Sequence, residues 1–205
     1  MTSMVDIVVG LSLVVSPLCA AGLNLAPPRR VALVLLTGVF AGVGANIGLG
    51  QQLRIGLALL ATGGLACAIL AIGFERASWP GQGEGVGLVP AGRAFRAATV
   101  LLVAAAAWGI AAPYASGIGA LPAARVTAAL MIMAMGLLQL GLSQEQGAAA
   151  LGLLTALAGF ELLYAGLEPS LALRAVLAGI MLGVALVSSV LLQPSGEVTE
   201  SRRTG

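Results

Sequence analysis

The chain has 205 residues, of which 59% are hydrophobic and only 9% are charged. A soluble domain carries roughly 25% charged residues, so the composition argues against a soluble enzyme, and the apolar content excludes a disordered chain. The net charge is +2, and the ten basic residues are all arginines spread along the chain, which gives no basic stripe for nucleic acid. The sequence therefore predicts an integral membrane protein that lies in the lipid bilayer and binds no nucleic acid.

The residue types that most catalytic sites need are scarce. The chain has no histidine, which removes the commonest zinc ligand and the commonest general base. Cys19 and Cys67 lie in separate apolar runs, so neither a metal site nor a disulfide framework is indicated. We recognise no phosphate-binding loop, paired-carboxylate site or nucleophile–base pair, and we expect no catalytic residues and no cofactor.

Seven stretches are long enough to cross a bilayer, whose core needs about 20 apolar residues in a helix. In chain order they are residues 7–28, 31–53, 55–74, 97–124, 126–144, 146–167 and 175–196, with the fourth helix ending near residue 113 and the seventh before Pro194. None alternates with the period of two that membrane strands show. The predicted fold is an all-α polytopic bundle of seven transmembrane helices. Its first helix is an uncleaved span, because no basic n-region precedes it.

The arginines predict the orientation, because cytoplasmic loops of membrane proteins are rich in basic residues. On the side of the N-terminus the connections hold three arginines: Arg54, Arg125 and Arg174. The opposite side holds the remaining seven: Arg29, Arg30, Arg76, Arg93, Arg96, Arg202 and Arg203. We therefore expect a multi-pass protein of the inner (plasma) membrane with its N-terminus outside and its C-terminus in the cytoplasm.

A segment rich in glycine and proline, residues 75–96, divides the chain and is predicted to be a cytoplasmic connector. It separates a three-helix front part, residues 1–74, from a four-helix back part, residues 97–192. We expect the polar residues 193–205 to be a disordered cytoplasmic tail. The similar stretches VLLTG (34–38) and GLLTA (152–156), together with Arg54 and Arg174 at the start of the third and seventh spans, favour a parallel tandem repeat of three helices.

Small residues recur at every fourth position in two spans. In lipid, such stripes let helix backbones approach closely. The residues are Gly38, Gly42 and Asn46 in the second span, and Ala175, Gly179 and Gly183 in the seventh. These stripes serve either packing inside the bundle or an interface with another membrane subunit, and the sequence leaves both interpretations open.

Glu161 is the one carboxylate that the sequence places inside a span. Its insertion costs roughly 2.5–3.5 kcal/mol, and desolvation disfavours its ionised form, so we expect it to exchange a proton near neutral pH. Tyr164 and Glu168 follow on the same helix face and complete a polar stripe that leads toward the outer surface. One interpretation makes this stripe a proton relay. The other makes Glu161 a protonated group that only bonds to a neighbouring helix.

Two stretches of the back part resemble a known family. ALAGFELLYAG (156–166) resembles a helix centre of the pattern glycine–hydrophobic–glutamate–leucine, and LAGIMLGVALVSSVLL (177–192) resembles the helix that follows it. Both patterns are typical of subunit K of bacterial NADH:quinone oxidoreductase, whose relatives are the corresponding small subunit of multisubunit sodium/proton antiporters and component E of membrane-bound hydrogenases. The resemblance covers residues 126–192 and implies that Glu161 serves in a membrane proton path. The second glutamate of the respiratory members falls on Gly179, which argues against a two-carboxylate relay.

These observations give one leading hypothesis and two alternatives. The leading one is a membrane subunit, without a redox centre, of a proton- or ion-translocating respiratory, hydrogenase or antiporter-type complex. Its partners would be other integral membrane subunits, of the larger antiporter-like kind. The first alternative is a structural or assembly subunit without a transport step. The second is a stand-alone transporter of a small solute, for which the sequence offers no broken helix near the bilayer midplane.

Overall fold

The computed structural model describes residues 2–25, 27–50, 53–76, 92–114, 122–143, 145–165 and 171–192. Within these ranges all regular structure is helical: α1 (Thr2–Leu23), α2 (Arg29–Gly50), α3 (Leu53–Arg76), α4 (Arg93–Ala111), the 3₁₀ turn η1 (Ala112–Tyr114), α5 (Ala123–Leu142), α6 (Gln146–Tyr164) and α7 (Leu171–Leu191). Each of the seven α-helices is long and apolar enough to cross a membrane. Within the described residues, the prediction of an all-α fold with seven helices long and apolar enough to span a membrane is confirmed.

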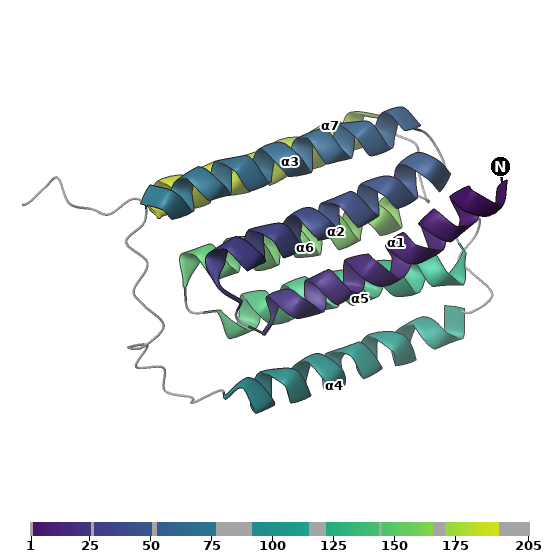
Figure 1. The fold of residues 1–205 in the computed structure, drawn as a ribbon, viewed down its shortest axis with the longest axis horizontal. Coiled ribbons are helices and arrows are strands. Elements are labelled where there is room, and N and C mark those ends of the chain that lie inside the picture. Colours follow the sequence, from purple (N-terminus) through teal and green to yellow (C-terminus); the bar gives the residue numbers. More distant parts are fainter. Residues whose placement is uncertain are drawn as a thin grey trace, which may run out of the picture.

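The helices form two layers (Figure 1). One layer holds α1, α2 and α3 side by side, and the other holds α5, α6 and α7, so that α1 lies against α5, α2 against α6 and α3 against α7. The two middle helices, α2 and α6, are the most buried. The fourth helix, α4, lies at the edge and packs on α5. Each helix of the front part therefore contacts the helix in the corresponding position of the back part.

Glycines allow the closest helix pairs to touch backbone to backbone. Between α5 and α6, a Cβ added at Gly159 would lie 2.6 Å from the backbone nitrogen of Met133, and one added at Gly136 would overlap the backbone of Ala156. Between α2 and α3, a Cβ at Gly56 would run into the backbone of Gly48. Because lipid gives little hydrophobic drive between helices, van der Waals contact at such approaches carries much of the packing.

The helices extend further into the predicted connector than the charges suggested. Helix α3 continues through Glu75 and Arg76, and α4 begins at Arg93, so both ends of the predicted 75–96 segment are helical. Long charged side chains tolerate such positions, because they bury their stems and hold the charged group in water. Residues 77–91 lie outside the described part of the chain, as does the predicted tail, 193–205.

Three arginines bind carbonyl groups at or near the C-terminal end of a neighbouring helix. Arg29 Nη1 donates to the carbonyl of Phe74 on α3 at 2.9 Å, and Arg125 Nη2 donates to that of Asn46 on α2 at 3.1 Å. Arg174 Nη2 donates to that of Ala165, just after α6, at 3.3 Å. The last carbonyls of a helix lack intrahelical partners and carry the negative end of its dipole, so these arginines stabilise helix ends in addition to any effect on orientation.

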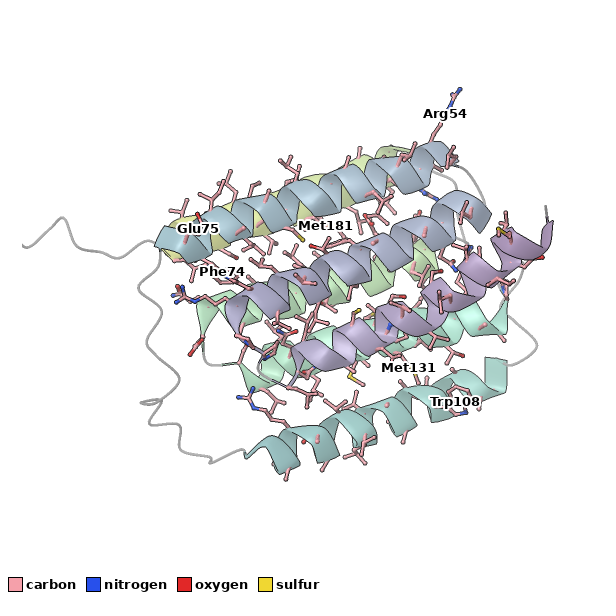
Figure 2. All side chains as sticks on the ribbon, in the orientation of Figure 1. Arg54, Phe74, Glu75, Trp108, Met131 and Met181 are labelled. Atoms are coloured by element: carbon pink, nitrogen blue, oxygen red, sulfur yellow. The ribbon has the colours of Figure 1, made fainter. Side chains whose placement is uncertain are left out.

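The two ends of the described chain lie at opposite ends of the bundle (Figure 1), as an odd number of spans requires. Arg54 and Glu75 mark the two ends of α3, and the Arg54 side chain extends beyond the bundle (Figure 2). Arg54, Arg125 and Arg174 all lie in the first turn of a helix that starts at the same end as α1. We call this the Arg54 end.

Candidate functional site: a cavity at the Arg54 end

A cavity of about 280 Å³ opens between the two layers, where α2, α3, α6 and α7 meet. Its walls are mostly apolar, and residues such as Ile55, Leu59 and Leu177 line it. Five of its lining residues are polar or charged: Arg54, Thr62, Glu161, Tyr164 and Arg174. A concave apolar site with a few convergent polar groups is the usual form of a binding site, and this one lies at the interface between the front and back parts.

The cavity reaches from the surface into the membrane-spanning part of the bundle. Arg54 is exposed and lies at the mouth, because it is the second residue of α3. Thr62 lies about 12 Å further along the same helix, at the rise of an α-helix. The cavity therefore extends from the Arg54 end of the bundle about two turns inward along α3, as far as Thr62.

Glu161 lines the cavity from the last turn of α6 and is half-buried. The helix ends at Tyr164, three residues before the end of the predicted span, so Glu161 lies only about 5 Å from the helix end. The sequence suggested a carboxylate well inside the span, whereas the structure puts it near one boundary. Glu161 is therefore close to the C-terminal end of α6.

Arg174 is the cationic neighbour that the sequence did not reveal for Glu161. It extends from the first turn of α7 into the lining of the same cavity, and its charge acts on the Glu161 carboxyl. Its Nη2 bonds the Ala165 carbonyl, whereas its Nε is buried without a hydrogen-bond partner. The guanidinium is planar and has five N–H donors in fixed directions, so this arginine has donor capacity beyond the bond to Ala165.

The structure brings two of the three predicted relay residues together. Tyr164 lines the cavity beside Glu161, and its ring stacks on that of Phe160 with 6.0 Å between centroids. Glu168, the third member of the predicted stripe, lies outside the described residues. Among the residues that the structure describes, no group of three His, Cys, Asp or Glu side chains could hold a metal ion.

The two small-residue stripes have different surroundings. On α2, a Cβ added at Gly38 would lie 3.0 Å from Cys19 Sγ, and one at Gly42 would lie 2.9 Å from Ser16 Cβ, so this stripe packs against α1. On α7, Gly179 and Gly183 are exposed, and nothing lies within 4 Å of an added Cβ at either position. Ala175, also exposed, lies at the cavity. Gly179 and Gly183 of the α7 stripe thus face outward from the described part of this chain.

Asn46, the last member of the α2 stripe, has a polar role that the spacing did not reveal. It is 1% exposed, and its Oδ1 accepts a hydrogen bond of 2.8 Å from Arg125 Nε. Arg125 was expected in a connection but lies in the first turn of α5, where it is 6% exposed. The neighbouring residue on α2, Ile47, lines the cavity. The sequence showed that Asn46 is a polar residue in a stripe of small residues, but it did not indicate that Arg125 is its hydrogen-bond partner.

No protein-family model, curated protein or solved structure matches the chain. The resemblance of residues 126–192 to the subunit K family therefore stays a prediction. What the geometry supplies on its own is a protonatable carboxyl in an apolar cavity, next to an arginine and close to one end of the bundle. Such a site can hold or release a proton, or bind a small ligand.

Proposed function

We propose that the chain is a membrane subunit of a proton- or ion-translocating complex, in which Glu161 takes up and releases a proton through the cavity at the Arg54 end. The observation that carries this proposal is the position of Glu161 in the wall of a cavity whose mouth holds the exposed Arg54. Ionisable side chains inside membrane spans mark ion or proton paths by default. The short resemblance around Glu161 supports the same role.

The surroundings of Glu161 allow both of its protonation states. The apolar walls favour the neutral carboxylic acid, because desolvation penalises a charge. Arg174 lies near enough for its charge to act on the carboxylate, which favours the ionised form. A group that relays protons must be able to exist in both the protonated and the ionised state at a small difference in free energy. The apolar walls and Arg174 favour opposite states and so keep this difference small.

The arrangement of the layers supports the tandem repeat and the orientation as part of the same proposal. Corresponding helices of the two parts contact each other pairwise, and the cavity lies between the two parts. Binding sites of transporters with internal repeats lie at the repeat interface. We place the Arg54 end outside the cytoplasm, because five of the described arginines lie at the other end of the bundle: Arg29, Arg30, Arg76, Arg93 and Arg96.

The deciding experiment replaces Glu161 with Gln in the native complex. A tag on the chain isolates it with its partner subunits, and the complex is reconstituted into vesicles that contain a pH-sensitive dye. We expect Glu161→Gln to reduce proton flux at least tenfold, because the amide has the same shape but does not titrate. Glu161→Asp keeps a carboxyl group and should retain part of the flux.

Glu145→Gln is the matched control, since this exposed glutamate precedes the start of α6 at the other end of the same helix. It should leave the flux unchanged. Full flux in Glu161→Gln would refute the relay and favour a structural or assembly subunit. Isolation of the chain without stoichiometric partners would refute the complex and favour a stand-alone transporter.

A further inference from the structure

We propose that the cavity at the Arg54 end binds a small aliphatic carboxylate, and that this anion takes the place of ionised Glu161 beside Arg174. The inference rests on the proposed protonation of Glu161 and adds a ligand class to the same site. It follows from three properties of the cavity: its size, its apolar walls and the balance of its charges. Each property is defined by residues that the structure describes.

The size of the cavity limits the ligand. An engineered apolar cavity of about 150 Å³ binds benzene, which has six carbon atoms. By proportion, the 280 Å³ here suit a ligand of roughly ten non-hydrogen atoms. A carboxylate with a chain of about eight carbon atoms has this size, so octanoate is a suitable probe.

The walls and the charged groups match the two parts of such a ligand. Ile55, Leu59 and Leu177 are among the apolar residues that would cover the chain. Arg174 provides the positive charge for the carboxylate, and the exposed Arg54 lies at the mouth. Arginine is the side chain best suited to carboxylates, because its planar fork forms two parallel hydrogen bonds. Burial of the chain and pairing of the head therefore act together.

The charge balance decides between an anion and a cation. Among the described lining residues, Glu161 and Arg174 are the two charged groups inside the cavity, because the exposed Arg54 side chain extends away from the bundle at the mouth (Figure 2). Arg174 lines the cavity and its Nη2 bonds the Ala165 carbonyl, and a carboxylate that reaches the other donors of this guanidinium would form charge-assisted hydrogen bonds. With Glu161 ionised, its charge offsets that of Arg174; with Glu161 protonated, Arg174 gives the described lining an excess of positive charge, which attracts anions and repels cations.

Among the described residues, few charged groups near Glu161 could alter this balance. From α7 it faces Arg174, from α3 the cavity brings Arg54, and on its own helix Tyr164 lies one turn away. On α5, the charged residue at this end is Arg125, which is bonded to Asn46. The described part of α2 at this end carries no charged side chain. Protonation of Glu161 therefore removes the negative charge with which Arg174 interacts, and an incoming anion supplies a negative charge in its place.

In the proposed step, the uptake of one proton is coupled to the binding of one anion. Glu161 takes up a proton from the side of the cavity mouth, and the carboxylate binds to Arg174 in its place. No covalent bond forms and no redox partner is needed. Binding of the anion is consequently accompanied by proton uptake, so the affinity must rise as the pH falls.

The test measures binding of radiolabelled octanoate to the full chain in nanodiscs, with empty nanodiscs subtracted, at pH 6 and pH 8. We expect at least fivefold tighter binding at pH 6. In Glu161→Gln, binding should be tight at both pH values, because the amide mimics the protonated acid. Octylammonium and octanol, which match octanoate in length, should bind at least tenfold more weakly. Palmitate is tested beside octanoate, because its binding would point to a fatty acid from the bilayer as the source rather than an acid from water.

Arg174→Gln should lose at least tenfold in octanoate affinity, Arg174→Lys should retain more affinity than Arg174→Gln because it keeps the charge without the planar fork, and Arg30→Gln at the other end of the bundle should change nothing. Helix content by circular dichroism shows whether each variant is folded, and Arg174→Lys keeps the test valid if Arg174→Gln is not. Equal binding of octanoate and octanol, or pH-independent binding in the wild type, would overturn the proposal. Such a result would leave the proton flux through Glu161 in place, whereas full flux in Glu161→Gln would refute the relay and leave octanoate binding in place.

Discussion

Arg125 on α5 holds Asn46 on α2 by two hydrogen bonds, from Nε to the side-chain Oδ1 at 2.8 Å and from Nη2 to the backbone carbonyl at 3.1 Å. Both residues are almost fully buried. The contact joins the front layer to the back layer at the Arg54 end. Asn46 directly precedes Ile47, which lines the cavity. The contact therefore fixes the position of α2 beside the candidate site.

Loss of this contact should destabilise the bundle. Arg125→Ala leaves the Asn46 Oδ1 buried without a donor, and a hydrogen bond to a charged group contributes about 1.5–3 kcal/mol. We expect a reduction of this size in the free energy of unfolding, measured by denaturant titration in mixed micelles. Arg30→Ala is the control, because Arg30 is exposed, and it should change the free energy by less than about 0.5 kcal/mol. If Arg125→Ala, Asn46→Ala and the double variant show additive losses, the coupling between the two residues is refuted.

The backbone contact between α5 and α6 predicts a second difference in stability. Gly136→Ala places a methyl group into the backbone of Ala156 and should reduce the free energy of unfolding by about 1–3 kcal/mol. Gly141→Ala, one turn later on α5, is the matched control, since nothing lies within 4 Å of its added Cβ. That variant should be neutral or gain up to about 1 kcal/mol, because alanine has the higher helix propensity. Equal stability of the two variants would show that α5 and α6 are further apart than described.

The outward stripe of α7 predicts that its residues matter to partners and not to the fold. Gly179 and Gly183 are exposed, and no described atom lies within 4 Å of a Cβ added at either position, so Gly179→Leu and Gly183→Leu should leave the melting temperature of the isolated protein within about 2 °C of the wild type, as expected for a surface substitution. In the native complex, the same changes should reduce co-purification of partner subunits if α7 lies against one of them. Unchanged co-purification in both variants would exclude this face as the partner interface. A large drop in melting temperature would contradict the described packing of α7.

The distribution of arginines predicts which end faces the outside. In a variant without Cys19 and Cys67, a cysteine at exposed Arg54 should react with a membrane-impermeant maleimide added to intact cells. A cysteine at exposed Arg30, at the opposite end, should react only after the membrane is permeabilised. The physical reason is the preference of basic residues for the cytoplasmic side. The reverse labelling pattern would place the Arg54 end, and the mouth of the cavity, in the cytoplasm.

The number and type of the spans could be predicted from the sequence, because the bilayer imposes a simple length requirement on each apolar segment. The ends of α3 and α4 could not, since charged residues such as Glu75 and Arg93 are tolerated within the terminal turns. Glu161 was identified as the unusual carboxylate because charges in spans are rare and costly. Its neighbour Arg174 was missed, because the two lie on different helices and no local spacing links them.

The sequence by itself determined that this protein is a seven-helix membrane bundle with one glutamate in a span, since these properties depend on composition and on the length of apolar segments. The tertiary structure decided which polar groups meet. The packing of α7 on α6 brings Arg174 to the cavity that Glu161 lines, and the packing of α3 on α7 adds Arg54 at its mouth. The Arg125 side chain reaches from α5 to Asn46 on α2. The structure also decided that the α2 stripe faces inward, whereas Gly179 and Gly183 of the α7 stripe face outward. The physical reason is that small-residue spacing specifies a face of a helix, whereas the partner of that face depends on contacts between segments distant in the chain.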